Sequence, residues 1–270
     1  AVTERLTSLS PEVQCKPNMY GNLLGNLAPA EFLARYWQKK PLLIRNALPG
    51  FESPLSPNEL AGLACEPDVR SRMILEEGGE YAWELREGPF EAETFMELPE
   101  SHWTLLVQEV DRLIPEVHDL LETVQFLPRW RIDDIMISYA PEHGNVGAHV
   151  DNYDVFLLQG YGQREWSISR TPVPPEEEEW IEDLDVRILS DFTADRTWEL
   201  NPGDVLYLPP RIPHHGIALN DCMTYSIGCR AATHRKLLLG WMEYLAGTLD
   251  ENTRYSDSDL SPRKNPGRIT

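Results

Sequence analysis

Hydrophobic and polar residues follow two different periods along the chain, and the change falls near residue 131. Before that point apolar residues recur mainly at helical spacing. The stretch 29–40, for example, places Phe32 and Tyr36 on one face and stops at Pro41. The apolar run 41–48 that follows predicts a strand.

Two further helices are predicted in this first half. Residues 56–64 carry the signals of a capped helix, because Ser56 stands at the N-cap, Pro57 at the first helical position and Glu59 three residues after the cap. The segment 101–124 is amphipathic throughout and predicts a long helix, interrupted near its proline.

From Asp133 onward the pattern changes to short β-rich runs separated by glycine, proline and asparagine turns. At least seven such runs predict a sandwich or a barrel, a mainly β fold with flanking helices. The runs are DDIMISYA, AHVDNYDVFLLQGYG, REWSISR, DVRIL, TWELNPGDVLYLPP, HGIAL and TYSIGCRA. An acidic insertion at 176–183 is interpreted as a solvated loop, and LLLGWMEYLAGTL after Lys236 predicts a closing helix.

These patterns divide the chain into four parts. We expect residues 1–18 to be a disordered lead-in or an added extension. Residues 19–130 form a helical and β region that packs on a barrel, and residues 131–235 form the barrel itself. Residues 236–270 form the closing helix and a polar tail.

The charge of the chain narrows its possible partners. The formal net charge is −20, which argues against direct binding to nucleic acid and fits a basic protein partner. The first residues contain no apolar signal segment, and no apolar run is long enough to span a membrane. The four cysteines form no metal-binding or disulfide spacing, so a reducing, cytoplasmic location is expected.

The strongest chemical signal is the triplet His149-Val150-Asp151. On a strand, residues i and i+2 point to the same face, so one imidazole and one carboxylate converge. The segment NPGDVLYLPPRIPHHGIAL supplies a third ligand, either His214 or His215, and adjacent strand residues face opposite sides. We choose His214, directly after Pro213, and leave His215 to a supporting position or to solvent. Two histidines and a carboxylate form the facial triad of non-haem Fe(II) oxygenases.

Several motifs together resemble one known family. WRIDDIMISYA, HVDNYDVFLLQGYGQREW, PGDVLYLPPRIPHHG and YSIGCRA, with FLARYWQKKPLLIRNAL before them, are similar to the JmjC-type, cupin-related ribosomal oxygenases. The resemblance runs from about residue 28 to 260 and is greatest to the bacterial branch. It implies a double-stranded β-helix (jelly-roll) core of the α+β class, with Fe(II), 2-oxoglutarate and O₂ as cofactor and co-substrates.

The resemblance also assigns roles to residues. It gives His149, Asp151 and His214 as iron ligands and Arg164 as the partner of the distal carboxylate of 2-oxoglutarate. A dianion in a narrow barrel needs such a cation, and arginine can grip a carboxylate with two hydrogen bonds. Residues on flanking strands are expected to line the same pocket: Ser138, Tyr139, Thr224 and Ser226.

The resemblance implies an activity as well. The bacterial branch hydroxylates Cβ of an arginine in the sixteenth-numbered protein of the large ribosomal subunit. Glu142 and Tyr161 could hold a guanidinium at the barrel mouth. Members of that branch continue into dimerisation helices and a winged-helix domain, so a homodimer is expected only where such an extension is present. The alternatives are a ribosomal histidine hydroxylase, a cupin enzyme without 2-oxoglutarate and a non-catalytic binding module.

Overall fold

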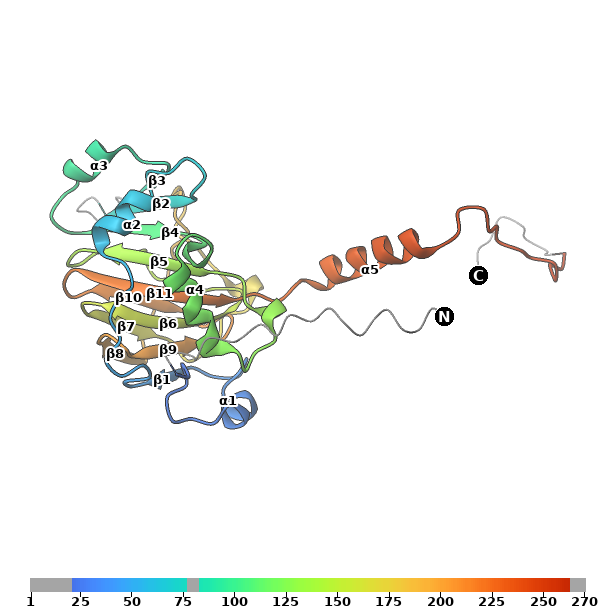
Figure 1. Cartoon of the computed structure of the whole chain (residues 1–270), viewed down its shortest axis with the longest axis horizontal. Coiled ribbons are helices and arrows are strands. Elements are labelled where there is room, and N and C mark those ends of the chain that lie inside the picture. The colour runs from blue at the N-terminus through green and yellow to red at the C-terminus, as the bar shows by residue number, and fades with distance from the viewer. Residues whose placement is uncertain (1–20, 77–82, 263–270) are drawn as a thin grey trace, which may run out of the picture. The chain divides into compact units, whose positions relative to one another are not determined.

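The computed structural model of the chain describes residues 21–76 and 83–262, which belong to two compact units divided after Arg230 (Figure 1). The expected lead-in at 1–18 lies outside the described residues. The first unit contains two antiparallel sheets. In spatial order, the strands of the larger sheet are β1 (Leu42–Ile44), β9 (Val205–Leu208), β6 (Asp154–Tyr161), β11 (Cys222–Cys229), β5 (Ile135–Ala140), β4 (Trp103–Val107), β2 (Ser71–Glu76) and β3 (Trp83–Glu87).

The smaller sheet has the order β10 (His214–Ala218), β7 (Arg164–Ile168) and β8 (Arg196–Leu200). Short helices and 3₁₀ turns connect the strands: α1 (Pro29–Arg35), α2 (Pro57–Leu63), α3 (Ala92–Met96), η1 (Val110–Arg112), α4 (Pro115–His118), η2 (Asp119–Val124), η3 (Arg129–Arg131) and η4 (Pro175–Glu177). The strands from β5 to β11 form the two facing sheets of a jelly-roll barrel, as the sequence predicted.

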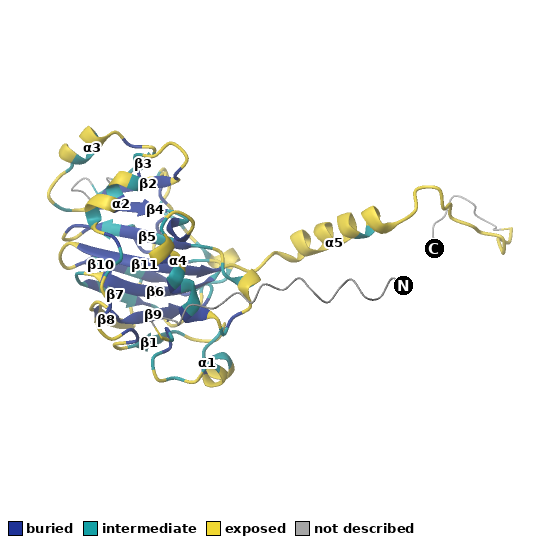
Figure 2. Cartoon of the chain, viewed as in Figure 1, coloured by how far each residue is buried: buried dark blue, intermediate teal, exposed yellow. Residues whose placement is uncertain are grey.

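Alternating residues of the central strands face two different cores. Val155 and Leu157 of β6 point between the two sheets, where they join Trp166 of β7 in one apolar cluster. Phe156 and Leu158 point to the other face and pack in a larger cluster with the N-terminal region. Because both faces of β6 are covered, seven of its eight residues are buried, and its centre, residues 155–158, is an uninterrupted apolar run (Figure 2).

The N-terminal region covers the outer face of the larger sheet and also adds strands to it. Phe32 of α1 packs edge-on against Tyr207 of β9, with the ring centroids 4.8 Å apart. The pair β2–β3 and the strand β4 extend the sheet beyond β5. The sequence patterns did not predict β2 or β3.

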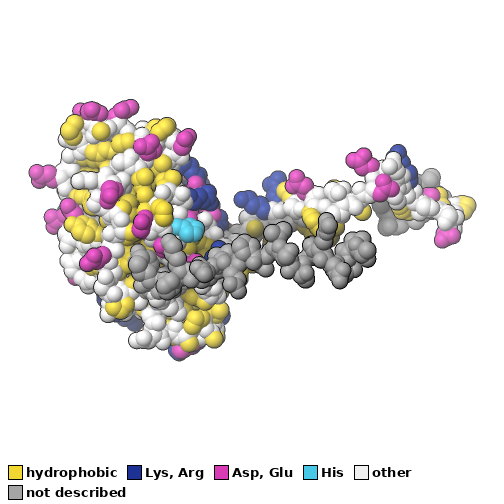
Figure 3. All heavy atoms as spheres, in the orientation of Figure 1, with side chains coloured by type: hydrophobic (Ala, Val, Ile, Leu, Met, Phe, Trp, Pro, Cys, Tyr) yellow, Lys and Arg dark blue, Asp and Glu magenta, His cyan; other side chains and the backbone are white. Residues whose placement is uncertain are grey.

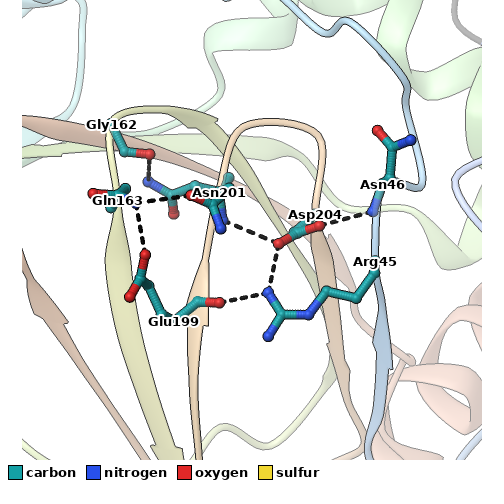
Figure 4. Close-up of polar contacts among 8 residues, drawn as sticks. Arg45, Asn46, Gly162, Gln163, Glu199, Asn201 and Asp204 are labelled. Atoms are coloured by element: carbon teal, nitrogen blue, oxygen red, sulfur yellow. Dashed lines mark hydrogen bonds and ion pairs between the residues drawn. The ribbon is translucent and has the colours of Figure 1, made fainter.

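A network of polar contacts joins three turns at one end of the barrel (Figure 4). Asp204, in the turn between β8 and β9, accepts hydrogen bonds from Arg45 Nη1 at 2.7 Å and from the Asn46 amide at 2.7 Å. Gln163, which precedes β7, donates to the side chains of Glu199 at 2.6 Å and Asn201 at 2.8 Å. The Pro-Gly-Asp turn therefore anchors the chain just after β1.

Several predicted elements are confirmed and others are wrong. The capped helix is α2, with both halves of the Ser56–Glu59 capping box formed. The helix predicted at 101–124 is wrong, because 103–107 is the fully buried strand β4, paired between β2 and β5, and short helical turns follow it. DVRIL is not a strand either, and only its Leu189 forms an isolated bridge, with Trp180.

The second unit, residues 231–270, contains the helix predicted near the C-terminus, α5 (His234–Thr248). The boundary between the two units, after Arg230, falls a few residues before the boundary after residue 235 that the sequence predicted. Within this unit most apolar side chains of α5 are exposed (Figure 2), among them Leu237, Leu238, Trp241, Met242 and Tyr244. None of the helices in the described part of the chain has the length and apolar character needed to cross a membrane.

Candidate metal centre

Three side chains from two chain segments converge beside the smaller sheet. Ligand atoms of His149, Asp151 and His214 all lie within 4.8 Å of one another. His149 and His214 are held opposite each other by two backbone hydrogen bonds, of 3.0 Å and 2.9 Å. His149 therefore pairs at the edge of β10 through an isolated bridge. The sequence predicted that the His-Val-Asp triplet lies on a strand, but the triplet lies just before β6 and outside any regular strand. The cluster is the one group of this kind among the described residues.

Both imidazoles are oriented by backbone carbonyls. The Nδ1 of His149 donates to Gly147 O at 3.0 Å, and the Nδ1 of His214 donates to Ile212 O at 2.8 Å. Each hydrogen bond fixes a tautomer whose Nε2 is free to bind a metal ion. Burial lowers the pKa of His214 to about 4, and the neighbouring His149 adds to this effect. His214 is therefore neutral at pH 7, as a metal ligand must be.

His215 points to the opposite side of β10, and so the structure places His214 in the cluster and not its neighbour. The Nε2 of His215 donates to Asn145 Oδ1 at 3.1 Å, and the same oxygen accepts the Gly147 amide at 2.9 Å. Burial lowers the pKa of His215 to about 4. His215 thus supports the loop that carries Gly147, the residue whose carbonyl orients His149.

The three ligands open onto a cavity of about 420 Å³ between the two sheets. Arg164 lies in the wall of this cavity and is only 2% exposed, yet its Nε and Nη2 have no hydrogen-bond partner. A buried guanidinium with two nitrogens that lack a hydrogen bond is costly unless a ligand pairs with it. The wall therefore fits a small anion, such as a carboxylate, that reaches Arg164 while its other end faces the metal ligands.

Other predicted pocket residues have mixed positions. Ser138, Thr224 and Ser226 line the same cavity, on the neighbouring strands β5 and β11. Tyr139, adjacent to Ser138, points away into the N-terminal core, because successive strand residues alternate between faces.

Glu142 and Tyr161, which we expected at the barrel mouth, do not line the cavity. Tyr161 ends β6 far from the triplet that precedes this strand, and it borders a separate surface hollow together with Phe51. Glu142 is exposed beside His143, in the turn that follows β5. The two residues were chosen because they are close in sequence to the motifs. The direction of the strands, however, places them away from the cavity lining.

Several residues around the site were not predicted from the sequence. The Tyr153 hydroxyl forms a hydrogen bond with Asp151, and burial raises the pKa of Tyr153 above its usual range. The spacing of Tyr153, two residues after Asp151, was the available signal. Charged residues from distant segments form the outer part of the cavity wall, and no local motif marks them: Arg70, Arg72, Glu87, Asp133, Asp134 and Arg230.

The jelly-roll fold and this metal-ligand cluster define the class of protein. Residues 119–237 match the family described as "JmjC domain". Part of the chain therefore matches the JmjC domain, and most of the chain is similar to bacterial ribosomal oxygenases.

Two relatives are similar over most of the chain. One is the "Ribosomal protein uL16 3-hydroxylase" of Escherichia coli, 39% identical over 88% of this chain and 62% of the relative. Another is the "Probable ribosomal oxygenase" of Haemophilus influenzae, 38% identical over 87% of this chain and 56% of the relative. The chain thus spans less than two thirds of the length of either relative.

Among solved structures, the E. coli ribosomal oxygenase YcfD in complex with cobalt and 2-oxoglutarate superposes with a TM-score of 0.78. It is 38% identical in sequence, and the superposition covers 93% of this chain and 64% of that protein. An X-ray structure of the same E. coli protein gives a TM-score of 0.81, with 39% identity over 91% of this chain and 64% of that one.

Proposed function

We propose that this protein is an Fe(II)- and 2-oxoglutarate-dependent oxygenase that hydroxylates Cβ of an arginine in the ribosomal protein uL16, in the cytoplasm. The observation that carries the proposal is that one cavity contains both the His149–Asp151–His214 cluster and the guanidinium of Arg164, whose Nε and Nη2 have no hydrogen-bond partner. The relatives named as a uL16 3-hydroxylase and a ribosomal oxygenase support the choice of substrate.

Each residue has a distinct task in this reaction. His149, Asp151 and His214 would hold the ion on one side and leave the cavity side open. Arg164 would bind the distal carboxylate of 2-oxoglutarate, and Ser138 and Thr224 supply hydroxyl groups in the same wall. When bound, iron with 2-oxoglutarate and O₂ supplies the oxidation that adds one oxygen atom to a C–H bond, with succinate and CO₂ as products. The apolar wall from Leu157 and Trp166 keeps water away from this chemistry.

Charge supports a basic protein substrate. The net charge is −20, and acidic side chains are spread over the visible face of the first unit (Figure 3). The segment 173–191 contains eight acidic residues and one arginine. The Leu189 amide of this segment donates to the carbonyl of Ala148 at 2.8 Å, directly beside the metal ligand His149. A cationic segment of the substrate would meet this acidic segment as it approaches the cavity.

The test uses protein purified without oxygen and supplied with Fe(II), 2-oxoglutarate and a peptide from the arginine-containing loop of uL16. After air is admitted, we expect mass spectrometry to find the mass of one added oxygen atom on the arginine. His149→Ala should abolish this gain. The matched control is His118→Ala, which removes an exposed histidine of α4 outside the cluster.

Other outcomes would change the proposal in defined ways. Oxygen added to a histidine would reassign the target residue, and succinate formed without peptide modification would contradict the substrate but not the oxygenase chemistry. No succinate and no binding of 2-oxoglutarate would favour a non-catalytic binding module.

A further inference from the structure

Arg211 occupies a backbone conformation that its side chain disfavours. Its φ is +70°, in the left-handed region that glycine adopts readily and other residues rarely. The residue lies three positions before His214, in the turn between β9 and β10. An arginine at such a position indicates that its side chain makes contacts that offset the strain.

The side chain of Arg211 makes three polar contacts with two other segments. Its Nε donates to the Val173 carbonyl at 2.7 Å, and its Nη1 donates to Asn152 Oδ1 at 2.9 Å. Its Nη2 forms an ion pair with the carboxylate of Glu178. The side chains of Arg211 and Glu178 are only 14% and 12% exposed, so this pair is largely shielded from water.

The backbone of Arg211 completes the connection. Its amide donates to the carbonyl of the metal ligand Asp151 at 2.8 Å, and its carbonyl accepts the Val173 amide at 2.9 Å. Arg211 therefore ties together the segment of Asp151 and Asn152, the acidic segment and the turn that leads to His214. It lies outside the lining of the cavity, so it acts on the metal centre only through these residues.

We propose that Arg211 is a positioning residue, which fixes Asp151 and His214 relative to each other by clamping both segments to the acidic segment through Glu178. The proposal rests on the metal centre of the proposed function. Without the side chain, the backbone hydrogen bond to Asp151 can persist, but Asn152 and Glu178 lose their common partner. The carboxylate of Asp151 and the imidazole of His214 would then be less fixed relative to each other, which would lower the affinity of the site for a metal ion.

The test is Arg211→Gly, with Co²⁺ alone as the probe. Glycine suits the left-handed backbone, so the variant relieves strain while it removes the three side-chain contacts. We expect it to remain folded, to bind Co²⁺ roughly tenfold or more weakly than the unmodified protein, and to change the visible absorption spectrum of the bound ion. Arg211→Lys, which keeps one donor and the charge, should recover part of the affinity.

The matched control is His143→Gly, which removes an exposed side chain at another left-handed position, with φ of +65°. It should leave both the Co²⁺ affinity and the spectrum unchanged. If Arg211→Gly does not fold, Glu178→Gln replaces it, because this change removes the ion pair and leaves the turn intact. It should weaken Co²⁺ binding in the same direction.

Two results would overturn the proposal. Unchanged Co²⁺ affinity and spectrum in Arg211→Gly, even with a lower melting temperature, would assign Arg211 a purely structural role. Failure of the unmodified protein to bind Co²⁺ would remove the metal centre itself, and with it the proposed function. Because metal binding needs neither substrate nor turnover, a wrong substrate assignment leaves this test unaffected.

Discussion

The hydroxyl of Tyr153 donates a hydrogen bond to the carboxylate of Asp151, two residues earlier in the chain. Burial is the main reason that the pKa of Tyr153 is raised, and the charge of Asp151 raises it further, so the hydroxyl keeps its proton and remains a donor. Such a partner fixes the orientation of a ligating carboxylate.

Removal of this hydroxyl should weaken metal binding. We expect Tyr153→Phe to bind Mn²⁺ about 10- to 100-fold more weakly, the usual effect of losing a residue that orients a ligand. Calorimetric titration with Mn²⁺ measures the change. Tyr139→Phe is the control, because Tyr139 forms its hydrogen bond with Asp221, outside the metal-ligand cluster. Equal Mn²⁺ affinities for the two variants would contradict the role of Tyr153.

Replacement of Arg164 should affect ligand binding more than folding. The buried Nε and Nη2 of Arg164 have no partner, so Arg164→Met should not lower the melting temperature of the ligand-free protein. The unmodified protein with Mn²⁺ should gain about 2.7 kcal/mol when 2-oxoglutarate is present at 100 times its Kd, and Arg164→Met should lose that gain.

Thermal unfolding with and without 2-oxoglutarate checks this expectation. Arg170→Met, which removes an exposed arginine paired with Asp195, is the control and should keep the full stabilisation. A 2-oxoglutarate-dependent increase that survives in Arg164→Met would show that the dianion binds elsewhere.

Charge reversal in the acidic segment should weaken substrate capture. Glu176 and Glu177 are exposed, so Glu176→Lys/Glu177→Lys should leave the fold intact and raise the KM for a basic uL16 peptide several-fold. The value of kcat should stay the same, and the difference should shrink as salt is added. Glu91→Lys/Glu93→Lys changes the net charge equally at the start of α3 and serves as the control. Identical KM values for the two double variants would rule out the acidic segment as the contact.

Local patterns predicted the site better than its surroundings. His149 and Asp151 are two residues apart, and a proline directly precedes His214. Short sequence spacing was therefore sufficient to predict the three metal ligands. Arg211 and Glu178 could not be found in this way, because their pairing depends on how the acidic segment folds back on the barrel. The helix predicted at 101–124 failed for a related reason: pairing of 103–107 with strands on both sides outweighed an apolar spacing that also suits a helix.

The Asp204 network should be important for stability. Asp204 is buried and accepts from Arg45 and from the amides of Asn46 and Asn201. Asp204→Ala removes these charge-assisted hydrogen bonds, whose donors belong to exposed residues, and should lower the free energy of unfolding by about 2 kcal/mol. Equilibrium unfolding in urea measures the loss. Asp195→Ala, which breaks an exposed ion pair, should cost less than about 1 kcal/mol, and similar losses in both variants would contradict the argument.

The capping box of α2 predicts a small pH dependence. The backbone hydrogen bond from Ser56 lowers the pKa of Glu59 below its ordinary value of 4.5. A lowered folded-state pKa gives stability that is present above pH 4.5 and is lost as the pH falls through the folded value. Glu59→Gln keeps a capping acceptor that does not titrate, so its stability should fall less than that of the unmodified protein between pH 6 and pH 3.5. Urea unfolding of both proteins at the two pH values measures this difference in stability. Equal losses of stability in the two proteins would contradict the prediction.

The paired backbones of His149 and His214 bring together ligands that the chain separates by the whole stretch from β6 to β9. No complete set of ligands exists until the two sheets have met, so the free energy of metal binding adds to the free energy of closing the barrel. An ion bound by His149, Asp151 and His214 therefore indicates that the two sheets of the barrel are in contact. The rate at which a chelator removes the ion would set an upper limit on how often the two sheets separate at that edge.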